Sequence, residues 1–168
     1  TRPAFWYLSY AVPDPPLAPP KEYLEMYDQM EFSKPLEGEW TKEDPEKLPF
    51  AYQYYKNLYN WFDKNNRIDI AKKAYYATCT YIDHQLRLVI GTLREQGLLE
   101  DTIILFTADH GEMLGTHGLF GKFLMYENSV KIPFILSPPA SCGMVCNRVD
   151  DRIVELRDVM PTLLTLAG

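Results

Sequence analysis

Residues 102–111 read TIILFTADHG, an uncharged run of strand length followed by an aspartate, a histidine and a glycine. An unbroken apolar run of this kind is typical of a central strand in a parallel sheet that helices cover on both faces. Ligands of open α/β sheets collect beyond the carboxyl ends of the strands. We therefore predict a strand over residues 102–108 and a candidate site at Asp109 and His110.

The segment before this strand predicts a long amphipathic helix. Between residues 69 and 96 the apolar positions recur at intervals of three and four, which is the spacing of one helix face. Asp69 is a candidate N-cap, and Gly97 follows where a left-handed C-cap is wanted. We expect a helix from residue 69 to residue 96.

Further elements on either side indicate an α/β domain. Residues 5–12 read FWYLSYAV and predict a buried strand, and residues 133–136 read PFIL and predict another. A short helix is expected over residues 21–30. A last helix is expected over residues 158–166, where Asp158 could be the N-cap and Pro161 is tolerated because it falls in the first turn. An order of strand, helices, strand, loop, strand and helix is that of an α/β domain.

Two loops rich in proline separate these elements. Residues 13–20 read PDPPLAPP and predict a rigid, extended loop, because each proline fixes its own φ and restricts the residue before it. Residues 31–50 are polar and contain three prolines and a glycine, which predicts a long surface loop. The tyrosine-rich residues 51–62 fit either a helix or an irregular segment.

Composition excludes several classes of protein. The 168 residues suggest about one domain, and 23 acidic against 17 basic residues give a net charge of −6. That balance argues against a nucleic-acid binder. No stretch approaches the roughly 20 apolar residues of a membrane span. The opening Thr-Arg-Pro does not read as a targeting segment, so the compartment is left open.

Four polar residues are candidates for chemistry around the glycine-rich segment 111–121. Asp109 and His110 could bind a divalent metal, although a loop cap and a hydrogen-bonded histidine are commoner outcomes for such a pair. Lys122 could meet an anionic substrate as a point charge, or it is an ordinary surface lysine. His117 could contact the substrate or tie the loop down, and the pattern favours the second role. Cys142 and Cys146 lack a nearby histidine, which disfavours a zinc site.

Residues 107–122 read TADHGEMLGTHGLFGK and resemble the second metal-binding segment of the sulfatases, in the alkaline-phosphatase-like superfamily. Residues 75–99, 126–135 and 158–168 are similar to the segments that flank it in that family. The resemblance covers nearly the whole chain. It implies an α/β fold in which residues 1–168 are a single fragment of a sandwich, with a mostly parallel sheet flanked by helices.

The resemblance also implies roles for particular residues. Asp109 and His110 become metal ligands for a divalent cation, with calcium expected first and manganese, magnesium or zinc left open. Lys122 becomes a catalytic residue that contacts the sulfate or phosphate oxygens of an anionic ester. The implied reaction is ester hydrolysis by a nucleophile next to the metal.

Two departures from the family pattern limit what this chain can do by itself. The upstream C-x-P-x-R or S-x-P-x-R motif, which supplies the formylglycine nucleophile, does not occur in these residues, nor does the accompanying pair of metal-binding aspartates. In the proline-rich loop, Asp14 stands where the family usually has a histidine that contacts the ester. If Asp14 occupies that position, its carboxylate should pair with Lys122 or accept a hydrogen bond from a cation or hydroxyl of the substrate. The alternative is that Asp14 is an ordinary turn residue of Pro-Asp-Pro.

The sequence thus predicts part of a metal-dependent sulfuric ester hydrolase that needs the remainder of its catalytic domain as a partner. Alone, the chain is expected to be inactive. One alternative is a phosphonate monoester or phosphodiester hydrolase of the same superfamily. The other is a catalytically silent homologue with a binding or structural role, which the absent motif and Asp14 would favour.

Overall fold

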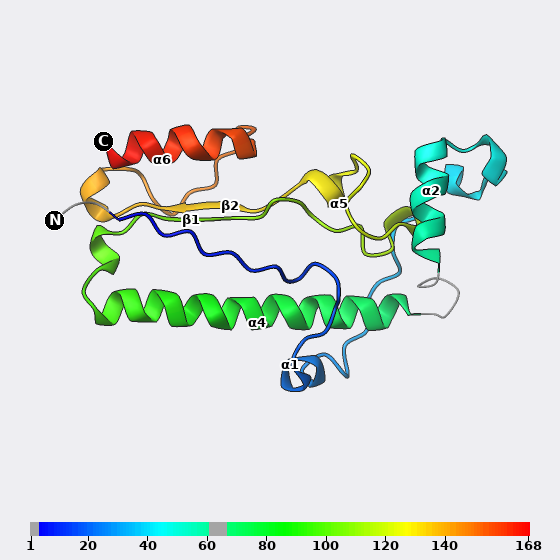
Figure 1. Ribbon diagram of the computed structural model, residues 1–168, viewed down its shortest axis with the longest axis horizontal. Helices are drawn as coiled ribbons and strands as arrows, with labels where there is room; N and C mark the ends of the chain where they lie inside the picture. The colour runs from blue at the N-terminus through cyan, green and yellow to red at the C-terminus, as the bar shows by residue number, and fades with distance from the viewer. Residues whose placement is uncertain (1–3, 61–66) are drawn as a thin grey trace. The chain divides into compact units, whose positions relative to one another are not determined.

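The computed structural model describes residues 4–60 and 67–168 (Figure 1). Its contacts divide the chain into two compact units, and the long helix α4 passes from one to the other. The first unit comprises residues 1–9, 88–109 and 133–168. The second comprises residues 10–87 and 110–132.

The first unit contains a two-stranded sheet. Strand β1 (Ile104–Thr107) pairs with strand β2 (Phe134–Ser137), and Leu105 lies opposite Leu136. Both strands were predicted; β1 is shorter than expected, and β2 has the expected length but begins one residue later. Their pairing is antiparallel, so the α/β class is confirmed whereas the mostly parallel sheet is not.

The remainder of the first unit is helical or irregular. Three 3₁₀ turns, at Leu99–Asp101, Ala140–Cys142 and Leu156–Asp158, lie along it. Helix α6 (Val159–Ala167) matches the predicted last helix and is drawn in red in Figure 1. Before it, the Asp158 carboxylate accepts a hydrogen bond from the backbone N–H of Glu155 at 2.8 Å, which closes a capping box.

The buried strand predicted over residues 5–12 is wrong. This segment has no assigned strand, and its aromatic side chains are exposed, with Phe5 72% and Tyr7 80% accessible. A strand needs a neighbour for its backbone N–H and C=O groups. In the part of the chain that the structure describes, the sheet consists of β1 and β2 alone.

Helix α4 (Ile68–Glu95) confirms the predicted long helix, and Gly97 after it has a φ of +66°. Leu98 and Gly97 donate backbone hydrogen bonds to Leu93 and Arg94, as in a Schellman motif. Asp69, expected as the N-cap, lies inside the first turn instead, where its charge still faces the positive end of the helix dipole.

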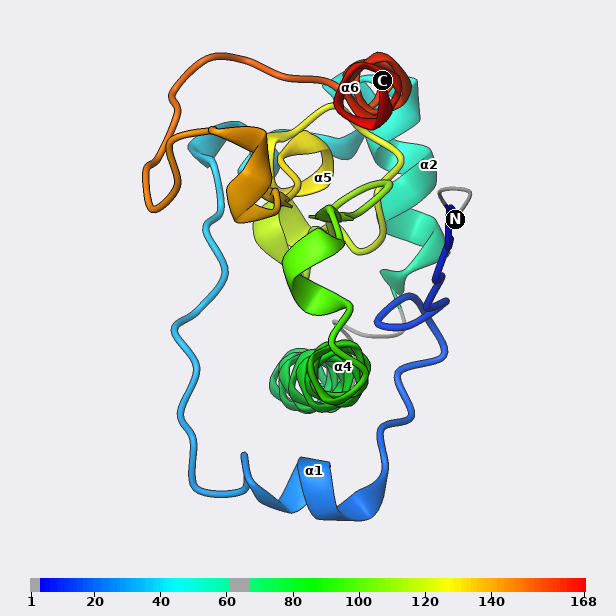
Figure 2. The same ribbon diagram turned by 90° about the vertical axis from the view of Figure 1, so that its left-hand side faces the viewer.

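Helix α1 (Lys21–Glu25) is shorter than the predicted helix over residues 21–30 and belongs to the second unit with the first part of α4. The hydroxyl of Tyr27 lies 2.6 Å from that of Thr80, and the hydroxyl of Tyr23 lies 3.0 Å from Nδ1 of His84. These side-chain contacts hold α1 beside α4, as Figure 2 shows in the view along α4.

The core of the second unit is small and aromatic. Leu48, Tyr52, Met113 and Leu119 are its buried members, and partly buried aromatic rings surround them. The predicted loop over residues 31–50 is mostly exposed, but its Leu48 enters this core.

Two 3₁₀ turns, Glu39–Lys42 and Pro45–Lys47, lie in that loop. Helix α2 (Phe50–Leu58) follows, so the tyrosine-rich segment is helical as far as Leu58. Residues 61 and 62 of that segment lie outside the described residues. No helix in the described parts of the chain has the length and apolar character needed to cross a membrane.

Candidate functional site

The candidate site begins where β1 ends. Asp109, exposed to solvent, closes the β1 segment of the first unit. His110 opens the glycine-rich segment of the second unit and is half-buried, with 31% of its side chain accessible. Its Nδ1 lies 2.9 Å from the carbonyl oxygen of Gly111, which orients the ring.

Gly111 is required by a close approach of the backbone. Its N–H donates to the carbonyl oxygen of Ser129 at 2.7 Å. A Cβ atom at this position would lie 2.0 Å from the carbonyl oxygen of Asn128, which no side chain tolerates. The glycine therefore lets the chain after His110 dock against helix α5 (Glu127–Val130).

Ser129 connects this docking point to Lys122. It is 3% accessible, and its Oγ donates to the carbonyl oxygen of Lys122 at 2.6 Å. Its own carbonyl accepts from Gly111. One buried residue thus fixes the backbone of the lysine relative to the backbone next to His110.

Glu112 links the two ends of the glycine-rich loop by hydrogen bonds. Its Oε1 accepts hydrogen bonds from the backbone N–H of Gly121 at 2.6 Å and of Leu114 at 3.2 Å. The N–H of Met113 also donates to the carbonyl of Gly121 at 2.9 Å. The sequence analysis missed Glu112 and Ser129, although a carboxylate between glycines was a usable signal for the first.

Lys122 and Asp14 meet, which is one of the two roles that were offered for Asp14 from the sequence. The Nζ of Lys122 donates to Oδ1 of Asp14 at 2.5 Å, across 108 positions of sequence. Both side chains are partly buried, with 25% and 39% accessible. The same carboxylate oxygen lies 4.0 Å from Nε2 of His110. The proline-rich loop and the glycine-rich loop thus bring three charged or titratable groups together.

Two tyrosines stand within electrostatic range of this cluster. Burial raises the pKa of Tyr59, and the charges of Glu112 and Asp14 raise it further while Lys122 opposes them. Burial, with the negative charges around it, raises the pKa of Tyr75 to about 12. Both hydroxyls are therefore harder to ionise than that of an ordinary tyrosine. Nothing in the sequence pattern singled them out.

His117 ties the loop over residues 31–50 to the core. Its Nδ1 accepts a hydrogen bond from the N–H of Gly38 at 3.1 Å, and its carbonyl accepts one from the Tyr52 hydroxyl at 2.8 Å. Its ring also packs against Trp40 and Tyr126. These are the contacts of the loop-tying role, and its predicted substrate contact stays a prediction.

The residues present supply only part of a metal site. In the described residues, no group of three or more His, Cys, Asp or Glu side chains could hold a metal ion. Asp109 and His110 offer one carboxylate and one imidazole, which suit a divalent cation but fall short of its usual coordination number. Their predicted role as metal ligands stays a prediction. The three cysteines are free thiols.

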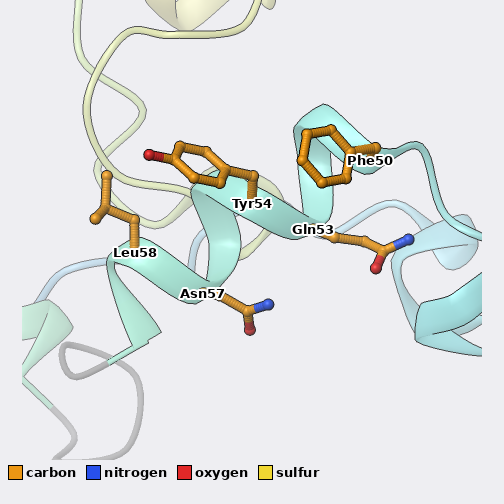
Figure 3. Close-up of a pocket in the computed structure, with 5 residues that line it drawn as sticks. All are labelled: Phe50, Gln53, Tyr54, Asn57 and Leu58. Carbon is orange, nitrogen blue, oxygen red and sulfur yellow. The ribbon is translucent and has the colours of Figure 1, made fainter.

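Two hollows in the described part of the chain lie away from the candidate site. One of about 300 Å³ lies along the side of α2 and is lined by Phe50, Gln53, Tyr54, Asn57 and Leu58 (Figure 3). A second of about 420 Å³ is lined mainly by Trp40, Tyr52 and Tyr126 with their neighbours. Neither is lined by Asp14 or Lys122, so the candidate site is defined by its polar contacts.

Comparison with known proteins decides the family. The sequence profile of the Sulfatase family matches residues 1–168. The chain belongs to the sulfatase family. An arylsulfatase of Clostridium perfringens is 39% identical over 170 residues, which cover 99% of this chain and 34% of that protein. The resemblance that the sequence analysis drew from residues 107–122 is confirmed.

Other relatives broaden the range of reactions within this group. A choline-sulfatase of Rhizobium meliloti is 27% identical and covers 99% of the chain and 32% of its own length. The phosphonate monoester hydrolase SpPMH of Silicibacter pomeroyi has a similar structure, with a TM-score of 0.80 and 29% identity over 93% of this chain and 32% of that one. The sulfatase chain described above thus spans about a third of these relatives.

Proposed function

We propose that this chain forms part of the active site of a metal-dependent sulfuric ester hydrolase. The observation that carries the proposal is the convergence of Lys122 and His110, both in the segment shared with the sulfatases, on the carboxylate of Asp14. A sulfatase site must neutralise the oxygens of an anionic ester next to its metal ligands. These side chains supply a cation and an imidazole for that purpose.

Asp109 and His110 are the residues that would hold the divalent metal, together with ligands from the remainder of the catalytic domain. Such a cation would supply positive charge to the nucleophile and to the ester oxygens. Calcium is the first candidate, while manganese, magnesium and zinc suit an imidazole ligand as well.

Lys122 is the catalytic and substrate-binding residue of this part of the site. Its ammonium group would bind a non-bridging oxygen of the ester and offset the charge that grows there in the transition state. Ser129 and Glu112 hold the backbone on either side of it, which keeps the ammonium group in place before substrate arrives. Asp14 and, less directly, His117 complete the substrate side.

A second candidate is a phosphonate monoester or phosphodiester hydrolase. The structural similarity to the phosphonate monoester hydrolase SpPMH favours it. Both reactions act on a singly charged ester at a tetrahedral centre, so the described residues would serve either one.

The experiment compares turnover of an aryl sulfate with that of a phosphonate monoester by a full-length enzyme that carries this chain. We expect the higher kcat/KM for the sulfate. A preference for the phosphonate ester would establish the second candidate instead. If a correctly folded, metal-loaded enzyme hydrolysed neither ester, the protein would be a catalytically silent homologue. The 168-residue chain alone serves as the control and should show no turnover.

A further inference from the structure

We propose that Asp14 makes this site discriminate between esters by charge, favouring singly charged esters over doubly charged ones. The inference rests on the proposed function, because it requires that the ester oxygens meet Lys122. It goes further in naming the substrate class and the residue that selects it.

The position of the Asp14 carboxylate carries the argument. Its Oδ1 lies 2.5 Å from the ammonium nitrogen of Lys122 and 4.0 Å from Nε2 of His110. An ester that binds Lys122 must therefore place its oxygens beside this carboxylate. With 25% and 39% of their side chains accessible, Lys122 and Asp14 are shielded from water enough for charges to act on one another.

A second carboxylate lies near this pair. Glu112, Lys122 and Asp14 all act electrostatically on the Tyr59 hydroxyl, and the two carboxylates raise its pKa while Lys122 lowers it. The Tyr59 and Tyr75 hydroxyls are neutral, because the pKa of each is raised. The Glu112 carboxylate is already engaged by two backbone N–H groups.

Substrates of the two candidate reactions differ from phosphate monoesters in charge. A sulfate monoester and a phosphonate monoester each carry one negative charge, whereas a phosphate monoester carries two above its second pKa of about 6. One additional charge about 5 Å from a carboxylate, at an effective dielectric constant of about 20, corresponds to a penalty of about 10²-fold in binding. Asp14 repels the first negative charge of every ester equally, so this first repulsion does not discriminate between the esters. The penalty from the second charge falls on the doubly charged ester alone.

The test measures kcat/KM at about pH 8, where the phosphate monoester is doubly charged. Nitrophenyl sulfate, nitrophenyl phenylphosphonate and nitrophenyl phosphate are compared in a full-length enzyme carrying this chain. The two phosphorus esters separate the effect of charge from that of the central atom. The variants are Asp14→Asn, which removes the charge at nearly constant shape, and Asp14→Glu, which keeps the charge. Asp44→Asn, at an exposed position, is the matched control.

We expect Asp14→Asn to raise the activity on nitrophenyl phosphate relative to both singly charged esters by about tenfold or more. Asp14→Glu and Asp44→Asn should leave that ratio within about twofold. Equal changes on all three esters in Asp14→Asn, including equal losses, would overturn the inference while the proposed function stood. A wild-type enzyme that hydrolysed none of the three would overturn the proposed function first.

Discussion

The glycine-rich loop and the opening segment of the chain contrast sharply. Residues 110–122 bury Met113 and Leu119 in the core, and their backbone forms hydrogen bonds with Glu112 within the loop and with Ser129 of helix α5. Residues 5–8 read FWYL, yet each of them is exposed. The loop's contacts come from nearby parts of the chain, whereas the apolar segment lacks a surface to cover it among the described residues. Buried side chains and hydrogen bonds to the backbone therefore hold the candidate site together, whereas the opening segment has neither among the described residues.

Replacing Glu112 with alanine should produce the largest loss of stability on the loop side of this comparison. The change leaves the N–H groups of Gly121 and Leu114 without their acceptor, and bonds to a charged group are the stronger kind. We expect a loss of about 2–4 kcal/mol in the free energy of unfolding. Urea unfolding of the full-length enzyme measures it. A change under about 0.5 kcal/mol would show that the loop holds its shape without Glu112.

Replacing Ser129 with alanine should have a smaller but more specific effect. It removes a buried hydroxyl that bonds the Lys122 carbonyl, which costs about 1–2 kcal/mol. Turnover should fall with it, because the lysine backbone loses its anchor. Thr78→Ala is the matched control, since that buried hydroxyl bonds a carbonyl within helix α4. If the two variants lost turnover equally at equal stability, Ser129 would have no specific role in positioning Lys122.

The raised pKa of Tyr75, near the candidate site, predicts how the stability of the fold changes at alkaline pH. The pKa of Tyr75 is raised to about 12 from an ordinary value of 10.0, so the folded state favours the neutral hydroxyl. Its contribution is fully present below pH 10 and is lost as the pH rises toward 12. Tyr75→Phe should flatten the fall of stability over that interval, which alkaline unfolding of the wild-type enzyme and the variant measures. Identical alkaline unfolding profiles for the two proteins would contradict this.

The smallest effect should come from the opening segment. In the 168-residue chain, Tyr7→Ser should change the free energy of unfolding by less than about 0.5 kcal/mol, because the side chain is 80% accessible. Calorimetry on the wild-type chain and the variant makes the comparison, and a loss above about 1 kcal/mol would mean that the Tyr7 side chain is buried by its surroundings.

The sequence predicted those parts of the molecule that local patterns control. The periodic apolar positions specified helix α4, and Gly97 after it takes the positive φ of a C-cap. The pairing of Asp14 with Lys122 was one of two roles that followed once the resemblance had placed both residues at one site. The strand over residues 5–12 was predicted wrongly, because apolar composition reports a tendency to be buried and says nothing of the neighbour that must bury it. Ser129 was missed, since its role depends on a fold that brings α5 against Gly111.

The measurement that tests the central claim most directly is the turnover and metal content of Lys122→Ala in a full-length enzyme, beside Asp109→Asn. If Lys122 meets the ester and Asp109 holds the metal, Lys122→Ala should lower kcat on an aryl sulfate by about 10²- to 10³-fold with its metal content unchanged. Asp109→Asn should lose metal and activity together, and added metal should restore part of both. Unchanged turnover in Lys122→Ala, or equal metal loss in the two variants, would contradict the assignment of the glycine-rich loop as the ester-binding part of a sulfatase site.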